Sequence, residues 1–328
     1  MKKKITIISV CIVLLSILLI FMTVLLVSGC TEYKFEDRVA AEETDVMISI
    51  MPRKANGQEG SGTYVPETRV TENEIKSAFV LVYNASRIFE KSKDMGTGTP
   101  VTLTLREGKK SIFIVANASD GLKAKLNASP SYATLIDLLS EDADYNAGKY
   151  PAQGLLMSGK AEQTIAVGSA NAVKVKLNYC MTRIALYLRK GSNDVDNITI
   201  KTVKLNNARN KGYLYKEDMY SSKVSNMVTP ENTQITSYTA GSDGTLIAAQ
   251  YTYPTVNATD IAFEISLNHA NTASADTYTI YLNESNTASN TTLQPNNQYK
   301  VIVTFSKDES GTLSVTAFTE KIVDFDIG

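Results

Sequence analysis

The chain has 328 residues, a formal net charge of −1 and a hydrophobic fraction of 43%. A near-neutral chain without a basic run excludes the charge pattern of a nucleic-acid-binding protein, and the lack of extended acidic blocks argues against a solvated tail. The length suits two domains, because a typical domain has about 100–200 residues.

The first thirty residues carry the pattern of an export signal. Lys2–Lys4 are basic, Ile5–Val27 are apolar or small, and a Ser-Gly pair leads directly to Cys30. This pattern predicts a lipoprotein signal peptide over residues 1–29 and a diacylglycerol thioether on Cys30. A plain transmembrane segment is the alternative, since about 20 apolar residues span a bilayer. After processing, Cys180 is the only unmodified cysteine, so no intramolecular disulfide is expected.

Apolar and polar residues alternate with a period of two along most of the remaining chain, which predicts β-strands separated by turn residues. In the first half the expected strands are Val46–Met51, Ala78–Tyr83, Val101–Leu105, Ser111–Ala116, Val173–Leu177 and Ile184–Leu188. They continue with Ile198–Leu205, Ile247–Tyr253, Ile261–Leu267, Tyr278–Leu282, Tyr299–Phe305, Leu313–Phe318 and Val323–Ile327. Many short strands at regular spacing are typical of β-sandwiches.

Two segments of the remaining chain do not follow this alternation of apolar and polar residues. Ser131–Ser140 is the only segment that predicts a helix, with Ser131 as N-cap and leucines on one face. The polar run Lys190–Asn197 follows a strand and predicts a domain boundary. We therefore expect an all-β protein with two β-sandwich domains in tandem, 70–190 and 191–328, and one short helix in the first domain.

The segment Pro52–Asn73 is a long polar loop directly after the first expected strand. Loops longer than about 12–15 residues are uncommon inside compact domains and tend to be functional or disordered. This one contains Arg53 and Arg69, and exposed loops are where proteases cut. On this segment alone, an uncut surface loop and a processing site are both open interpretations.

No residue grouping predicts catalysis or metal binding. His269 is the only histidine, so a His-His metal pair is excluded, and the single mature cysteine excludes a cysteine-rich zinc site. Glu141, Asp142 and Asp144 lack the spacing of a calcium loop and are interpreted as a solvated helix end. No nucleophile elbow, phosphate loop or dinucleotide fingerprint is present. We predict no catalytic residue, no metal, no cofactor and no enzymatic activity.

The order of the segments carries a resemblance. A lipobox, one alternating strand and an arginine-bearing loop are followed by IKSAFVLVYN at 75–84 and KSIFIVANAS at 110–119. TRIALYL at 182–188 and LQPNNQYKVIVTF at 293–305 come next, and a last strand ends the chain. Over nearly its whole length the chain resembles the fimbrillins, the type V pilins of certain Gram-negative anaerobes.

This resemblance implies two transthyretin-like sandwich domains and an assembly route. The precursor is expected to be lipidated, carried to the outer membrane, and cut by an Arg-specific protease between Arg69 and Val70, so that residues 30–69 form a propeptide. The displaced strand then carries Val46, Ile48 and Ile50 on its apolar face. The groove that it leaves receives a donor strand of another pilus subunit, for which the apolar residues are Val323, Phe325 and Ile327.

Other functions remain open at this point. The favoured one is a structural subunit of a cell-surface fimbria that supports adhesion. The alternative is a tip adhesin or glycan-binding surface lipoprotein of the same fold that is not polymerised, with Tyr213, Tyr215 and Tyr220 stacking on sugars. Those tyrosines also suit ordinary strand packing. The C-terminal strand, equally, could be an edge strand of its own domain. A surface hydrolase is the third possibility, although no catalytic grouping supports it.

Overall fold

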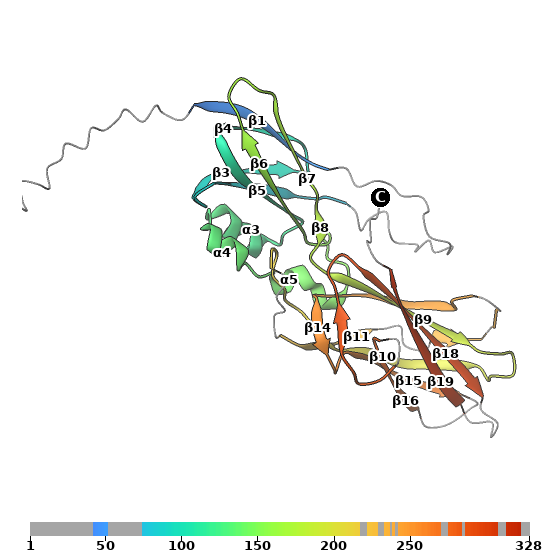
Figure 1. The fold of residues 1–328 in the computed structure, drawn as a ribbon. Coiled ribbons are helices and arrows are strands. Elements are labelled where there is room, and N and C mark those ends of the chain that lie inside the picture. Colours follow the sequence, from blue (N-terminus) through green and yellow to red (C-terminus); the bar gives the residue numbers. More distant parts are fainter. Residues whose placement is uncertain are drawn as a thin grey trace, which may run out of the picture. The chain divides into compact units, whose positions relative to one another are not determined.

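A computed structural model shows the fold of the chain (Figure 1). It describes residues 42–51, 74–216, 222–228, 233–236, 238–239, 242–269, 275–283, 286–307 and 313–322. Strands dominate this part of the chain and build several sheets that form sandwich-like domains, as the alternating pattern predicts.

Two sheets are built from the first half of the described chain. The smaller has the strand order β4-β1-β7, and the larger has the order β3-β2-β5-β6-β8. The strands of the smaller sheet are β1 (Glu43–Ile50), β4 (Val101–Arg106) and β7 (Asn171–Val175). Those of the larger sheet are β2 (Ala78–Asn84), β3 (Phe89–Gly96), β5 (Gly108–Ala116), β6 (Met157–Ile165) and β8 (Asn178–Tyr179).

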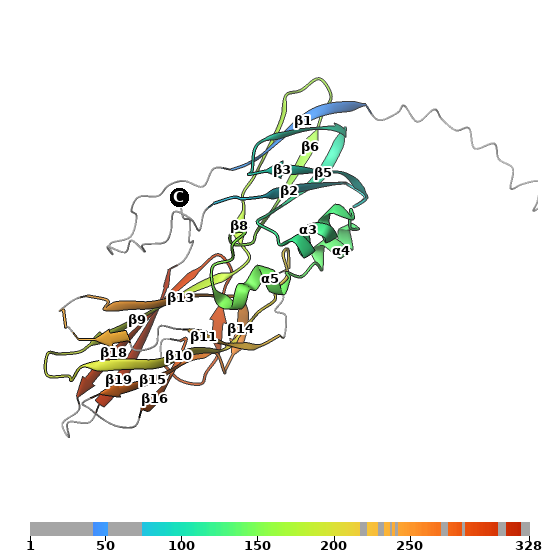
Figure 2. The same ribbon diagram turned by 180° about the vertical axis from the view of Figure 1, so that it is seen from behind.

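The central strands of the larger sheet are buried on both faces. Figures 1 and 2 show the β4-β1-β7 sheet on one side of this sheet and helices α3 and α4 on the other. On the helix side, Tyr83 contacts Phe113 and Tyr132 edge to face, with ring centroids 5.7 Å and 5.5 Å away. This double burial explains why β2 and β5 read as continuous apolar runs rather than alternating ones.

The helices differ from the single one expected. Ser131 does cap a helix, since its hydroxyl accepts from the Thr134 amide at 3.1 Å, but this helix ends at Ile136 rather than Ser140. Leu138 and Leu139 belong instead to a segment that bridges to the chain near Tyr213. The described residues hold three α-helices and one 3-10 helix: α3 (Asp120–Asn127), α4 (Tyr132–Ile136), α5 (Asp142–Tyr145) and η1 (Asn146–Gly148).

Periodicity missed α3 and α5 because they are short. Only Leu122 and Leu126 of α3 are buried, and two apolar positions in eight residues do not establish a helical period. Asp144 of α5 is fully buried and accepts from the backbone amides of Ser119 and Glu141 at 2.7 Å each. The acidic cluster that the sequence placed at a solvated helix end therefore includes one carboxylate that ties α5 to the cap of α3.

The second half forms two larger sheets and one short pair of strands. The orders are β11-β10-β15-β16, with β12 also paired to β10, then β13-β9-β18-β19, and β14-β17. The strands β9 (Thr182–Lys190), β10 (Ile198–Ala208), β11 (Val224–Val228), β12 (Thr233–Ile235) and β13 (Thr245–Thr252) come first along the chain. They are followed by β14 (Thr255–Ala258), β15 (Ala262–His269), β16 (Asp276–Tyr281), β17 (Thr291–Leu293), β18 (Gln298–Lys307) and β19 (Leu313–Ile322).

Twelve of the thirteen strands expected from alternation have a counterpart in these sheets, and the last, Val323–Ile327, lies outside the described residues. The strands that alternation missed are polar or short. One of them, β3, has the sequence FEKSKDMG and forms a sheet edge, where charged side chains are expected.

The predicted domain boundary after residue 190 falls between β9 and β10. β9, however, pairs antiparallel with β13 and parallel with β18, which are both strands of the second half. By strand pairing, the change of sheets therefore comes before Thr182. Residues from Glu43 onward group as one compact unit by contacts, so a division into two domains stays a prediction.

Candidate functional site

β1 is the middle strand of its sheet. It pairs antiparallel with β4 from Glu43↔Arg106 to Ile48↔Val101, and parallel with β7 from Val46↔Asn171 to Ile50↔Val175. β4 and β7 are far apart in the sequence, and in this sheet they do not pair with each other, because β1 lies between them. Removal of β1 would therefore leave two strand edges with unpaired backbone groups, which is the most adhesive kind of surface a sheet can present.

The side chains of β1 alternate between the core and the solvent. Val46 and Ile48 are 0% exposed, and Ile50 is partly buried against the same core. On the opposite face Met47 is 49% exposed. Fully burying a Val or Ile side chain contributes about 1.5–3 kcal/mol, so the two central residues hold β1 firmly in its groove. The three residues expected on the apolar face of the first strand do lie on one face.

The two ends of β1 are packed differently. At the Ile50 end, a Cβ added to Gly98 would lie 3.3 Å from Ile50 Cδ1 and 3.2 Å from Ile75 Cγ2, so Gly98 passes close to both side chains. The amide of Met51 continues the pairing by donating to Val175 O at 2.9 Å. At the Glu43 end a cavity of about 280 Å³ lies between β1, β4 and the turn from β2 to β3. We call it the end cavity; its lining residues are Glu43, Asn84, Ile88–Lys91 and Thr104–Arg106.

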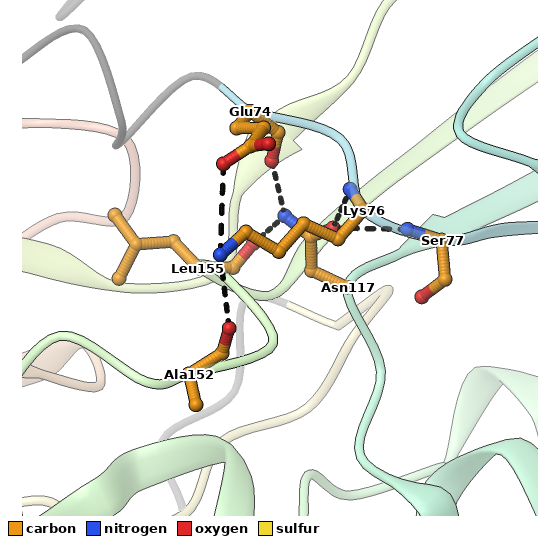
Figure 3. A network of polar contacts seen from close by, with 6 residues as sticks. All are labelled: Glu74, Lys76, Ser77, Asn117, Ala152 and Leu155. Carbon is orange, nitrogen blue, oxygen red and sulfur yellow. Dashed lines mark hydrogen bonds and ion pairs between the residues drawn. The ribbon is translucent and has the colours of Figure 1, made fainter.

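A polar network holds the described chain between Glu74 and Ser77, just before β2 (Figure 3). The side-chain oxygen Oδ1 of Asn117 accepts from the backbone amides of Lys76 and Ser77 at 2.8 Å and 3.4 Å. Its Nδ2 donates to Glu74 O at 2.8 Å and to Leu155 O at 3.0 Å. Because Asn117 is fully buried, these bonds are shielded from water. The segment Glu74–Ser77 is therefore held by its own contacts, independently of β1.

The backbone around Asn117 is shaped for this network. Asn117 has φ +59, in the left-handed region that Asn tolerates better than most residues. Gly154, with φ +90, passes so close that an added Cβ would lie 2.5 Å from Asn117 Nδ2. In the sequence, Asn117 stood out only as part of the segment KSIFIVANAS at 110–119, which contributed to the family resemblance. The sole hint of a larger role was an Asn directly at the end of a strongly apolar strand.

The other predicted site residues lie outside the described residues. This holds for the lipidation site Cys30, for the processing site Arg69 and Val70, and for the donor residues Val323, Phe325 and Ile327. β19 ends at Ile322, which pairs with Gln298. The structure therefore describes β1, and its displacement stays a prediction together with the lipid, cleavage and donor assignments.

Two titratable side chains that could suggest a reactive site have structural surroundings. His269 Nε2 lies 3.0 Å from Asp276 Oδ2 across the β15-β16 pair. Burial raises the pKa of the Cys180 thiol to about 12, so it is not a reactive thiolate at neutral pH. Among the described residues no group of three or more His, Cys, Asp or Glu is placed to hold a metal ion. Within the same ranges, no helix has the length and apolar character needed to cross a membrane.

The tyrosines considered for sugar stacking have other contacts. Tyr215 lies edge-on to Phe113, with ring centroids 4.9 Å apart, and its hydroxyl donates to Ile114 O at 3.0 Å. Tyr213 lies under the Lys216 ammonium, which is 5.3 Å from the ring centroid. Tyr220 lies outside the described residues. Tyr215 is thus used in packing against β5.

The described sheets form sandwich-like β domains in which β1 lies between two other strands, and comparison with known proteins gives the class to which this fold belongs here. The family described as Fimbrillin-A associated anchor proteins Mfa1 and Mfa2 matches residues 49–324. The chain belongs to this family, which confirms the fimbrillin resemblance read from the sequence. No curated protein sequence matches the chain significantly.

Several solved bacterial proteins have the same fold. The chain is similar to a candidate cell adhesion protein from Bacteroides eggerthii (TM-score 0.56, 18% identity, 86% of this chain and 97% of that one). It is also similar to a fimbrial assembly protein from Parabacteroides distasonis (0.54, 14%, 86% and 99%). A third is the tip fimbrial protein Mfa3 from Porphyromonas gingivalis (0.52, 14%, 84% and 99%). These likenesses show the fold, and the proteins are fimbrial and adhesion proteins rather than enzymes.

Proposed function

We propose that this protein is a structural subunit of a cell-surface fimbria that joins other subunits by strand exchange. One observation carries the proposal: β1 is the central strand of its sheet, and residues 52–73, which contain Arg53 and Arg69, connect it along the chain to β2. A cut in this segment converts β1 into a separate, non-covalently held strand. Its departure exposes an apolar groove between β4 and β7.

The route to assembly begins with export as a lipoprotein. Cys30 carries the lipid that attaches the precursor to the outer membrane, and an Arg-specific protease then cuts between Arg69 and Val70. The mature subunit is Val70–Gly328, which is 259 residues (328 − 69). The network around Asn117 supports this choice of site, because it holds the chain at Glu74, which is only a few residues after the cut.

The donor is the C-terminal strand of another subunit. Val323, Phe325 and Ile327 alternate with Asp324 and Asp326, so one face of this segment is apolar and the other acidic. Main-chain hydrogen bonds to β4 and β7 supply the pairing, and the apolar side chains fill the sites of Val46 and Ile48. Three buried side chains contribute roughly 5–9 kcal/mol before the entropic cost of association.

The test is the N-terminus of this chain in fibres purified from cells. We expect Val70 as the first residue, and Arg69→Ala should block assembly while the subunit still folds with β1 in place. Arg53→Ala is the matched control and should assemble normally. Fibres whose chains retain Met51 or Lys54 would contradict the cleavage site, and fibres whose chains retain β1 would contradict strand exchange.

A second candidate function is a tip or anchor protein of the same fold that keeps its lipid. The family description names anchor proteins, and one structural neighbour is a tip fimbrial protein. The mass of the mature protein separates the two functions. Loss of residues 30–69 indicates an exchanging subunit, whereas an acylated Cys30 on a full-length chain indicates an anchor or a stable surface lipoprotein.

A further inference from the structure

The end cavity continues the row of sites that the apolar face of β1 occupies. Leu103 lies opposite Val46 across the β1-β4 pair, and Leu105 lies opposite Thr44. Both leucines are buried. Thr44 shares its face of β1 with Val46 and Ile48, because side chains two residues apart point the same way. At this last position β1 presents a small polar residue to a wall that includes Leu105, and the adjoining space is unfilled.

This unfilled site is open to solvent while β1 is still in place. Ile88, in the turn between β2 and β3, lines it and is 61% exposed. Phe89 lines it too and packs partly against the core. At about 280 Å³ the cavity is smaller than the roughly 300–1,000 Å³ of small-molecule sites, which suits one or two side chains.

The described contacts at the opposite end of β1 are different. Gly98 passes close to Ile50 Cδ1, and the Met51 amide donates to Val175 O. The Asn117 network holds the backbone of Lys76 and Ser77, just after Ile75. A competing strand therefore finds an open cavity beside Glu43, with Leu105, Ile88 and Phe89 in its wall, and a strand end beside Ile50 that is still paired with β7.

The charges at the end cavity also depend on β1. Arg106 Nε lies 4.0 Å from Glu43 Oε1, and the Thr104 hydroxyl donates to Asp45 Oδ1 at 2.9 Å. Both carboxylates leave with β1, so Arg106 and Thr104 then lack those partners. The segment Val323–Ile327 alternates its apolar residues with two aspartates, which supply the same charge on the same strand face.

We infer that strand exchange starts in the end cavity. An apolar side chain of the C-terminal segment of a second copy enters it first, and the incoming strand then displaces β1 progressively from Thr44 toward Ile50. This inference rests on the proposed function and adds the place and direction of exchange. Stepwise displacement keeps most backbone groups paired throughout, whereas complete departure of β1 before binding would expose both strand edges at once.

The experiment measures how fast a nicked chain takes up a labelled peptide. The full chain with Cys30→Ser is cut in the Pro52–Asn73 loop with an Arg-specific protease and mixed with a fluorescent peptide spanning Lys321–Gly328. Uptake is followed by fluorescence anisotropy. Ile88→Trp fills the mouth of the cavity, and Ile88→Asp places a carboxylate there that repels the acidic peptide. We expect both variants to slow uptake at least tenfold.

Val256→Trp is the matched control, because Val256 is an aliphatic residue of the β14 strand that is 47% exposed and does not line the end cavity. It should take up the peptide at the wild-type rate, and thermal melting establishes that all three variants fold. Uptake by both Ile88 variants at the wild-type rate overturns the inference and leaves strand exchange intact. Failure of the nicked wild-type chain to take up any peptide overturns the proposed function itself.

Discussion

Replacing Ile48 by Ala tests directly how strongly β1 is held. Ile48 is 0% exposed and lies between Val101 of β4 and Val173 of β7, so its truncation leaves a cavity in the middle of the groove. Ile→Ala changes at buried sites cost about 2–5 kcal/mol, from lost burial and from the cavity itself. With a factor of ten for each 1.4 kcal/mol, the affinity of a nicked chain for its own β1 should fall about 30-fold to several thousand-fold.

Urea unfolding of the intact chain and release of β1 from the nicked chain measure the two consequences. Met47→Ala is the matched control on the same strand, since Met47 is 49% exposed on the opposite face. A surface substitution of this kind changes the free energy of unfolding by about 0.5 kcal/mol or less. If Met47→Ala destabilises the chain as much as Ile48→Ala, the assignment of the two faces of β1 is wrong. If Ile48→Ala leaves β1 release unchanged, the groove does not hold the strand by its apolar face.

Three further predictions concern Asn117, Tyr83 and the C-terminal segment. Asn117→Gly keeps the positive φ but loses four hydrogen bonds, so urea unfolding should show a loss of about 2–4 kcal/mol, and Asn117→Ala a larger loss because of its Cβ. Burial raises the pKa of Tyr83 to about 12, so the folded state keeps a proton that the unfolded state loses from about pH 10. Stability should therefore fall as pH rises between about 10 and 12, and less steeply in Tyr83→Phe; an equal slope would contradict this. Deleting Val323–Gly328 should leave the melting temperature nearly unchanged and abolish polymers, whereas a much lower melting temperature would assign that strand to its own sandwich.

Much of the fold was predictable because it follows from local patterns in the sequence. Alternation located β1, β10 and β15, since a half-buried strand must place every second side chain in the core. Ser131 was correctly read as a helix cap, because a hydroxyl before a helical turn satisfies a free amide. The family resemblance likewise came from the order of short segments, and it was confirmed over residues 49–324.

The polar strands and short helices were not predictable in this way. β3 lies at a sheet edge, so one of its sides has no neighbouring strand and much of its surface faces solvent. Its sequence FEKSKDMG therefore shows little alternation. β9 was identified as a strand, but the sequence did not show that it pairs with β13 and β18. Pairing partners far along the chain leave no trace in a local window of sequence.

The sequence by itself determined that the chain is a β-protein whose first strand has one apolar face and precedes a long polar loop with two arginines. It also placed a donor-like alternating segment at the C-terminus. Only the tertiary structure decided that β1 lies between β4 and β7, that Ile50 lies close to Gly98, and that the Glu43 end has an unfilled cavity. Only the structure shows that Asn117 holds the segment Glu74–Ser77 by hydrogen bonds. The reason is that alternation follows from the geometry of a single strand, whereas grooves, cavities and buried hydrogen bonds are formed by segments that meet only when the sheets close.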